Sequence, residues 1–255
     1  MSDRLDHLFA LDGRTALVTG GNSGIGLAMA EALGRQGARI VLVARRRALL
    51  ETAAAKLSAS AGITASTIVA DLAAPDGPDR VADAAGSEID IVVNAAGINL
   101  RSEFEAVTID EFDRHMAVHL RAPFRLAQRL APAMASRGFG RIVMLGSLQS
   151  VRAFQNSAPY GAAKGGVVQL TRAIAERWSR HGITCNAIAP GLFPTALTAS
   201  IFQDAALVAE RAAQTAIGRN GMMSDLYGAT IFLASDASSY ITGQTIFVDG
   251  GFTAK

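Results

Sequence analysis

The stretch Ala16-Leu17-Val18-Thr19-Gly20-Gly21-Asn22-Ser23-Gly24-Ile25-Gly26 decides the fold. A short apolar run typical of a β-strand leads directly into a glycine-rich turn, and a helical pattern follows as far as Gly37. Glycines at such a turn let the backbone approach a pyrophosphate closely, and the helix amino terminus offers unpaired N–H donors. The spacing is G-x-x-x-G-x-G, not the commoner G-x-G-x-x-G, so a purely structural glycine turn is the alternative.

The rest of the chain repeats this alternation of short β-branched runs and longer Ala- and Leu-rich helical patterns. Several of the strand runs are apolar throughout, as expected for strands covered on both faces. Strand–helix alternation with short turns predicts right-handed βαβ units, hence a single α/β domain with a doubly wound parallel sheet of the Rossmann type. The predicted strands are 16–19, 40–43, 66–70, 89–93, 141–145, 183–188 and 245–248, and the main predicted helices are 24–37, 46–61, 108–137 and 158–181.

Composition excludes several classes of protein. Half of the residues are apolar and 18% are charged, so the 255 residues can bury a large core without disulfides. The net charge is only +2, which argues against nucleic acid as a partner. There is one cysteine, Cys185, which we expect to be buried and inert. The polar amino terminus and the lack of a long apolar run predict a cytoplasmic protein without membrane contact, and no metal site is predicted.

The segment 192–220 interrupts the regular alternation, between the sixth predicted strand and the next helix. It carries its own Ala-rich helical patch at 205–215. Ligands of open α/β sheets bind at the carboxyl ends of the strands. A long insertion there is therefore a candidate substrate lid, and the alternative is an ordinary surface helix.

Arginines at the end of the second strand bear on the choice of nicotinamide cofactor. An acidic residue there would bond the ribose 2′-hydroxyl, whereas this chain has Ala44-Arg45-Arg46-Arg47. A guanidinium binds a phosphate through paired, charge-assisted hydrogen bonds. The pattern favours NADP(H), with NAD(H) possible. The alternative is a solvated basic start to the next helix.

Two further turns follow strand ends. The third strand ends in Asp71-Leu72 and the fourth in Asn94-Ala95-Ala96-Gly97. Asp, Asn and Gly are also what turns require, so each alone is weak evidence. Both lie where a dinucleotide would bind.

The strongest catalytic pattern follows the fifth strand. Ser147 closes that strand, and Tyr160-Gly161-Ala162-Ala163-Lys164 lies within the next helix. Residues four apart share a helix face, so Lys164 is expected one turn from the Tyr160 phenol. A phenol has a pKa of about 10, and a nearby ammonium together with an oxidised nicotinamide would lower it. Ser147 would donate a hydrogen bond to the substrate oxygen. By itself, a tyrosine four residues from a lysine is commonplace.

Together the motifs resemble the short-chain dehydrogenase/reductase family over nearly the whole chain. The matching pieces are 19–26, Asp71, 94–97, Ser147, 160–164, Asn186, 190–191 and 248–251. The resemblance implies about seven strands and a homotetramer. It also implies that Tyr160 is the acid/base, that Lys164 binds the ribose and lowers the tyrosine pKa, and that Ser147 orients the carbonyl. Residues expected to line the nicotinamide site are Pro190, Gly191, Leu192 and Thr195.

One position departs from the family pattern. The family places a fourth catalytic residue, an asparagine, where this chain has His119 in Val118-His119-Leu120-Arg121-Ala122-Pro123-Phe124. In the family, the backbone carbonyl of that residue holds a water linked to the lysine. His119 either substitutes adequately, joins the proton relay or impairs turnover, and we favour the first.

Three functions follow. Within the family, the segments 8–13, 146–150, 186–191 and 247–252 look most like gluconate 5-dehydrogenases and deoxygluconate dehydrogenases, which predicts a small carbonyl/alcohol substrate that is a sugar acid or polyol. Arg101 and Arg152 are candidate carboxylate ligands, although surface arginines are common. The alternative substrate is a 3-oxoacyl or other hydrophobic ketone, since the lid positions Leu192, Phe193, Leu197, Ile201 and Phe202 are apolar. The third hypothesis is a non-catalytic dinucleotide sensor, against which the intact Ser147, Tyr160 and Lys164 argue.

Overall fold

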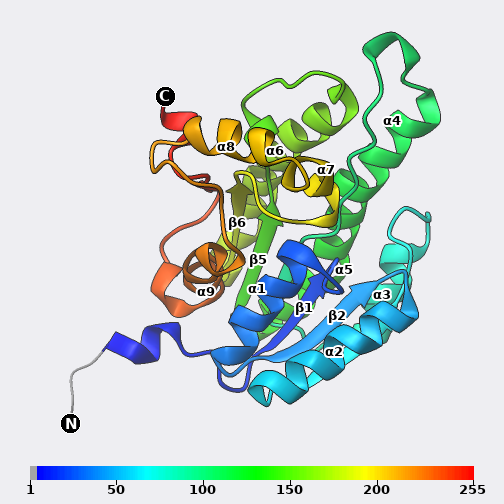
Figure 1. The fold of residues 1–255 in the computed structure, drawn as a ribbon. Coiled ribbons are helices and arrows are strands. Elements are labelled where there is room, and N and C mark those ends of the chain that lie inside the picture. The colour runs from blue at the N-terminus through cyan, green and yellow to red at the C-terminus, as the bar shows by residue number, and fades with distance from the viewer. Residues whose placement is uncertain (1–4) are drawn as a thin grey trace.

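A seven-stranded parallel sheet forms the centre of the computed structural model, which describes residues 5–255 (Figure 1). The strand order is β3-β2-β1-β4-β5-β6-β7, so the chain winds outward in both directions from β1 and β4. Every neighbouring pair is parallel. The doubly wound α/β fold is therefore confirmed. The strands are β1 (Thr15–Thr19), β2 (Arg39–Ala44), β3 (Ala65–Val69), β4 (Ile91–Asn94), β5 (Gly140–Leu145), β6 (Ile183–Pro190) and β7 (Thr245–Val248).

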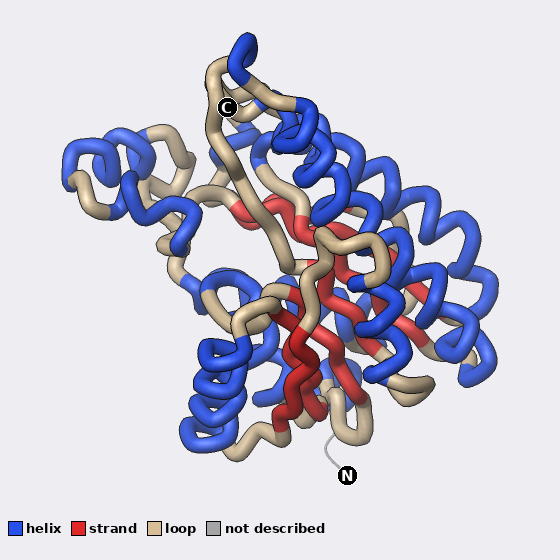
Figure 2. Tube along the Cα trace, turned by 90° about the vertical axis from the view of Figure 1, so that its right-hand side faces the viewer, coloured by secondary structure: helices blue, strands red, loops and turns tan. Residues whose placement is uncertain are grey.

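Helices cover both faces of the sheet, which lies between them in Figure 2. One core packs α1, α2 and α9 against the sheet, through residues such as Met29, Leu50 and Leu233. The other packs α3, α5 and α6, through residues such as Val81, Leu130 and Ile174. The helices are α1 (Gly24–Arg35), α2 (Arg47–Ala61), α3 (Gly77–Ala85), α4 (Ile109–Met116), α5 (Ala122–Arg137), α6 (Ala158–Trp178), α7 (Ala199–Phe202), α8 (Ala205–Ala213) and α9 (Tyr227–Ala234).

The predicted helix 108–137 is not continuous, because a π-helical turn at Ala117–Arg121 separates α4 from α5. Pro123 explains the interruption. In a regular helix the carbonyl of His119 would accept from the N–H of the fourth following residue, and proline has none. The N–H of Ala122 reaches back to the Ala117 carbonyl instead, five residues away. Single π turns of this kind occur often at functional sites.

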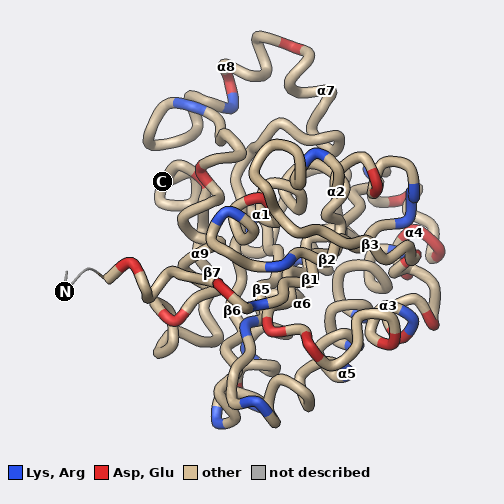
Figure 3. Tube along the Cα trace, turned by 90° about the horizontal axis from the view of Figure 1, so that it is seen from below, with Lys and Arg blue, Asp and Glu red and all other residues tan. Residues whose placement is uncertain are grey.

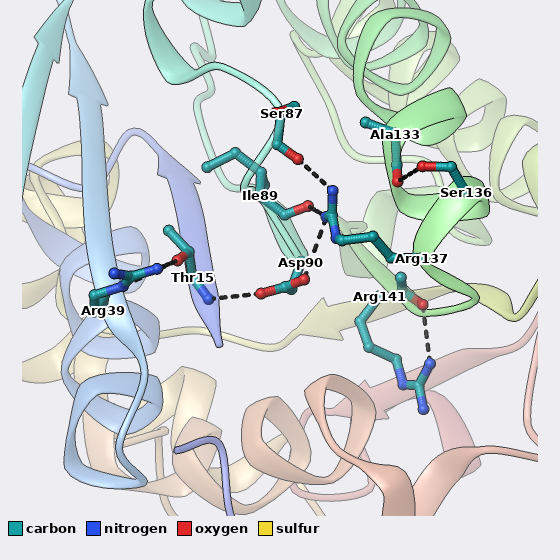
Figure 4. A network of polar contacts seen from close by, with 10 residues as sticks. Thr15, Arg39, Ser87, Ile89, Asp90, Ala133, Ser136, Arg137 and Arg141 are labelled. Atoms are coloured by element: carbon teal, nitrogen blue, oxygen red, sulfur yellow. Dashed lines mark hydrogen bonds and ion pairs between the residues drawn. The ribbon is translucent and has the colours of Figure 1, made fainter. Parts of the chain in front are cut away.

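A polar network fixes the amino ends of the central strands, at the opposite edge from the glycine turn (Figure 4). The Asp90 carboxylate accepts from the Thr15 backbone N–H at 3.0 Å and from Arg137 Nη2 at 3.2 Å. Arg39 donates to the Thr15 hydroxyl at 2.9 Å. These bonds tie β1, β2 and β4 to α5, so the sheet edge remote from the glycine turn is held by side chains as well as by backbone.

Several bulk expectations can be compared with the described residues. Cys185 is buried, as predicted, and burial raises the pKa of its thiol. Positions of basic and of acidic residues are interspersed along the chain trace in Figure 3. Within residues 5–255, no helix is both long enough and apolar enough to cross a bilayer.

The predicted insertion 192–220 holds α7 and α8, which project away from the sheet (Figures 1 and 3). α8 begins at a capped residue, since the Asp204 carboxylate accepts from the N–H groups of Ala206 and Leu207. No residue of α7 or α8 is buried. The segment therefore lacks a core of its own, as is usual for parts of a fold that open locally.

Candidate active site

A cavity of about 1060 Å³ opens at the carboxyl ends of the strands. It spans the switch point between β1 and β4, where open α/β sheets bind ligands. Residues from the glycine turn, the strand ends, α6 and the 192–220 segment share its wall. Of the predicted site residues, those lining it are Gly20, Asn22, Ser23, Gly24, Ile25, Gly26, Arg45, Arg46, Asp71, Leu72, Ala95, Gly97, His119, Ser147, Tyr160, Lys164, Pro190, Gly191, Leu192 and Thr195.

The glycine turn is shaped so that only glycine fits. Gly20 has φ +68°, and a Cβ there would lie 2.8 Å from Ala96 Cα. A Cβ on Gly26 would lie 2.5 Å from the Gly20 carbonyl oxygen. The turn therefore packs tightly against the turn after β4, and the first residues of α1, Gly24 to Gly26, line the cavity.

Asn22 gives a direct sign of a missing polar partner. Its side-chain Nδ2 is buried without a hydrogen-bond partner among the described residues, and Asn22 lines the cavity. Buried amide donors are rarely left unpaired in native proteins. A dinucleotide held by this turn would supply the acceptor, so the residues present fit such a group.

Arg45 and Asp71 face each other at the ends of neighbouring strands. Their closest charged atoms, Arg45 Nη1 and an Asp71 carboxylate oxygen, are 3.8 Å apart, and both side chains are about half exposed. Surface pairs of this kind contribute little to stability. The Arg45 guanidinium is therefore free to turn toward an anion in the cavity, and Arg46 lies beside it in the same wall.

Asn94, predicted to bind the cofactor, does not line the cavity. Its side chain is buried beneath it, where Nδ2 donates to the sulfur of Met144 at 3.4 Å. β4 and β5 are adjacent, so a side chain at the end of β4 reaches β5 rather than the open edge. Direct contact between Asn94 and the cofactor stays a prediction, whereas Ala95 and Gly97 just after it do line the cavity.

Ser147, Tyr160 and Lys164 converge from two elements. Ser147 follows β5 and accepts from the Gln149 backbone N–H at 3.1 Å, which fixes its hydroxyl. Tyr160 lies in the first turn of α6, and Lys164 follows one turn later on the same face. Lys164 Nζ lies 5.5 Å from the centre of the Tyr160 ring and donates to the Leu145 carbonyl at 2.5 Å.

Burial dominates the electrostatics of this pair. It raises the pKa of the Tyr160 phenol above 10.0, while hydrogen bonding with Ser147 and the charge of Arg101 act in the opposite direction. Burial also lowers the pKa of Lys164 to about 7. Lys164 is not among the groups that lower the pKa of Tyr160, so the lowering of the tyrosine pKa by this lysine stays a prediction.

His119 lies in the π turn with its imidazole buried behind Gly97. Its Nε2 is 2.8 Å from the Ile98 carbonyl oxygen and 3.3 Å from the Ile98 nitrogen. The shorter contact places the proton on Nε2 and leaves Nδ1, which has no partner among the described residues, as a bare acceptor. Burial, and then the charge of Lys164, hold the pKa of His119 well below 6.5, so the ring is neutral.

The two predicted carboxylate ligands differ in position. Arg101 lines the cavity and makes no ion pair or hydrogen bond within residues 5–255. Arg152 instead donates to the Lys255 backbone oxygen at 2.8 Å and does not line the cavity. Arg114 on α4 does, also without an ion pair among the described residues. Arg114, and not Arg152, therefore joins Arg101 among the cations that line the cavity.

Sequence reasoning missed three residues near the reacting groups: Arg114, His115 and Gln149. His115 is fully buried, and its ring centre is 6.4 Å from that of Tyr160. The Gln149 Oε1 atom is buried without a partner, and this residue lines the cavity. The one available signal was helical spacing, which places Arg114 and His115 about one turn before His119.

The glycine turn at the switch point and the Ser147, Tyr160 and Lys164 cluster define a dinucleotide-dependent oxidoreductase of the doubly wound class. Comparison with known proteins agrees. A family model described as enoyl-(acyl carrier protein) reductase matches residues 20–253. Gluconate 5-dehydrogenase of Gluconobacter oxydans (strain 621H) is 40% identical over 252 residues, covering 97% of this chain and 98% of that protein.

Two further proteins extend the comparison. Galactitol 2-dehydrogenase (L-tagatose-forming) of Cereibacter sphaeroides is 39% identical over 252 residues, 96% of this chain and 97% of that protein. A crystal structure of gluconate 5-dehydrogenase from Burkholderia cenocepacia J2315, in complex with NADP and tartrate, has a TM-score of 0.92 and 40% identity. It covers 99% of this chain and 100% of that one. The chain belongs to the short-chain dehydrogenase/reductase family, as the motifs predicted.

Proposed function

We propose that this protein is an NADP(H)-dependent oxidoreductase that interconverts a carbonyl and a secondary alcohol on a sugar acid or polyol, such as gluconate and 5-ketogluconate. One observation carries the proposal. Ser147, Tyr160 and Lys164 share a single cavity with the glycine turn and with three arginines, Arg46, Arg101 and Arg114, that have no ion-pair partner among the described residues.

The proton chemistry belongs to Tyr160. Its phenol has a raised pKa and is therefore protonated at neutral pH, ready to donate to a substrate oxygen as the carbonyl is reduced. When bound, the nicotinamide supplies or accepts the hydride. Ser147 donates a hydrogen bond to the same substrate oxygen, and Lys164 lies one helix turn from Tyr160 on the same face, where burial lowers the pKa of its amine to about 7.

The cofactor preference rests on Arg45 and Arg46 in the cavity wall. The residues that directly follow β2 are arginines, so no carboxylate stands there to repel a 2′-phosphate, and Asp71, which follows β3, makes only a loose, half-exposed contact with Arg45. The Burkholderia structure, which contains NADP, is consistent with this preference. NAD(H) is the weaker alternative.

A carboxylated substrate is favoured by the charge inside the cavity. Arg101 lines the same cavity as Tyr160, and its charge acts to lower the pKa of the phenol. Arg114 adds a second cation to the same wall. A guanidinium binds a carboxylate through two parallel hydrogen bonds. The names of the similar proteins, which include gluconate and galactitol dehydrogenases, point to the same class of small hydroxylated substrate.

A hydrophobic or 3-oxoacyl ketone is the second candidate. The observation in its favour is that Leu192, Phe193, Leu197 and Ile201 of the 192–220 segment line the cavity. Thr195 of the same segment would lie 3.4 Å from a Cβ on Gly24, so the segment packs over the glycine turn. We propose that it closes over bound ligands as a lid.

Assembly and location are further proposals. Phe112 on α4 and Phe124 on α5 are 40% and 50% exposed. Large exposed aromatics on neighbouring helices are typical of surfaces that bind another chain. We propose a homotetramer in the cytoplasm, without nucleic-acid partners, and light scattering of the purified protein measures its mass directly.

A substrate panel tests the proposal. Purified protein is mixed with NADPH or NADH and with 5-ketogluconate, a neutral ketose, or a 3-oxoacyl thioester, and loss of reduced nicotinamide is followed by absorbance. We expect fastest turnover with NADPH and 5-ketogluconate. Faster turnover of the thioester would select the second candidate. NADPH binding without turnover of any compound would favour the sensor hypothesis and overturn the proposal.

A further inference from the structure

Two histidines lie buried side by side behind the reacting groups. His115 lies in the last turn of α4 and His119 one turn later, and the two residues are 0% and 2% exposed. Their rings stack with centres 6.1 Å apart. The His119 ring also makes an edge-to-face contact with the Tyr160 ring. The two ring centres are 5.3 Å apart and the interplanar angle is 86°.

Both rings bind the backbone of one loop, residues 98–101. His115 Nε2 accepts from the Leu100 N–H at 3.2 Å, while its Nδ1 donates to the Glu111 carbonyl at 2.7 Å. His119 Nε2 donates to the Ile98 carbonyl at 2.8 Å. The loop has no helix or strand of its own, so these side-chain bonds replace the backbone pairing that regular structure would provide.

The loop carries groups that act at the reacting position. Arg101 ends it, and the charge of this residue acts on the Tyr160 phenol. Asn99 accepts from the buried Ser157 hydroxyl at 3.1 Å, which joins the loop to the residue before α6. α6 in turn carries Tyr160 and Lys164. A displacement of the loop would therefore move Arg101 relative to the phenol.

We propose that His115 and His119 are positioning residues, a stacked pair of buried imidazoles that clamp the 98–101 loop and so hold Arg101 in the wall of the cavity that Tyr160 also lines, where a carboxylated substrate would bind. The part that concerns the substrate rests on the proposed function above. The clamp itself rests only on the hydrogen bonds and ring contacts. The clamp also explains why position 119 is a histidine in this chain. An asparagine side chain is shorter and has no ring that could stack on His115.

A double-mutant cycle tests whether the clamp acts through Arg101. The variants are His115→Leu, which removes both ring nitrogens, and His115→Gln, whose amide oxygen restores an acceptor for the Leu100 N–H. Each is made alone and together with Arg101→Met, and His181→Leu, at an exposed histidine, is the matched control.

We expect His115→Leu to lower kcat/KM for 5-ketogluconate about tenfold, mainly through KM, with the Kd for NADPH unchanged. In the Arg101→Met background, His115→Leu should lower kcat/KM less than twofold, because the guanidinium that the clamp positions is absent. His115→Gln should recover activity to within about threefold of the wild type. Independent, multiplying effects of the two substitutions would overturn the proposal.

Amide hydrogen exchange gives a second readout that needs no substrate. Exchange over residues 97–102 should accelerate at least tenfold in His115→Leu and His119→Leu, and not in His181→Leu or Arg101→Met. If a leucine variant fails to fold, Asn99→Ala, which removes the acceptor for the Ser157 hydroxyl, is compared in the same way. Unchanged exchange in the clamp variants would refute the clamp even if the enzyme reduces sugar acids. A wild type that turns over no sugar acid would refute only the substrate assignment.

Discussion

Replacing Lys164 by methionine should make the protein more stable while abolishing turnover. The amine is 3% exposed and makes one hydrogen bond, to the Leu145 carbonyl. Burial lowers its pKa from 10.5 to about 7. A pKa difference of one unit corresponds to about 1.4 kcal/mol, so burying this lysine lowers the free energy of unfolding at neutral pH by at most about 5 kcal/mol. Loss of the charge-assisted bond to Leu145 offsets about 1–3 kcal/mol.

The pH dependence separates this effect from simple repacking. Because the folded pKa lies below the unfolded one, the unfolded chain binds more protons between pH 7 and 10.5. The stability of the wild type therefore rises with pH across that window, and Lys164→Met removes this contribution. At pH 7 the variant should be more stable by about 2 kcal/mol, or about 5 °C in Tm. At pH 9 the difference in free energy of unfolding between Lys164→Met and the wild type should be smaller by about 2 kcal/mol.

The assay is chemical unfolding at pH 7 and pH 9, at one fixed protein concentration because oligomers unfold in a concentration-dependent way. Lys56→Met, at an exposed position of α2, is the control and should change stability by less than about 0.5 kcal/mol. A Lys164→Met variant that is less stable at pH 7, or whose difference from the wild type is the same at both pH values, would refute the reasoning.

Three other outcomes follow from the site. Arg45→Asp should raise the KM for NADPH about 10–100-fold through loss of a charge-assisted contact, whereas Arg47→Asp should leave it unchanged. Equal changes of this KM in the two variants would contradict the assignment of Arg45 to the 2′-phosphate. Because the folded-state pKa of His119 is depressed, the wild type should lose about 1 kcal/mol of stability between pH 6.5 and 5.5 as the unfolded ring protonates, and His119→Gln should lack that loss in urea titrations. Gly26→Ala places a Cβ 2.5 Å from a backbone carbonyl and should cost about 1–3 kcal/mol, whereas Gly165→Ala has open space and should be neutral or stabilising; thermal unfolding of both variants distinguishes them.

The sequence predicts the sheet well because its strands are continuous apolar runs. Each predicted strand lies within two residues of the observed bounds at either end. The helix 108–137 was predicted as one element because its periodicity is unbroken. The signal of the π turn was local: Pro123 has no N–H to offer the carbonyl of His119.

The site is less predictable where it depends on burial or on contacts between distant segments. The spacing of Tyr160 and Lys164 shows that they share a helix face, but the direction of the tyrosine pKa depends on desolvation, which spacing does not reveal. Arg152 follows the serine loop in sequence, yet the carboxy-terminal residue Lys255 binds it. Arg114 reaches the cavity from α4, whose position depends on the packing of the whole domain.

The most direct test of the account is the Tyr160→Phe variant, studied in a single turnover with pre-bound NADPH and 5-ketogluconate. Removing one phenolic hydroxyl should slow hydride transfer about 10²–10⁴-fold, the usual contribution of a positioned acid. Fluorescence titration should find the Kd for NADPH changed less than about threefold. The proposed cofactor contacts at Asn22 and Arg45, in the cavity wall, are unaltered by the substitution. Hydride transfer at the wild-type rate in this variant would contradict the central claim that Tyr160 delivers the proton.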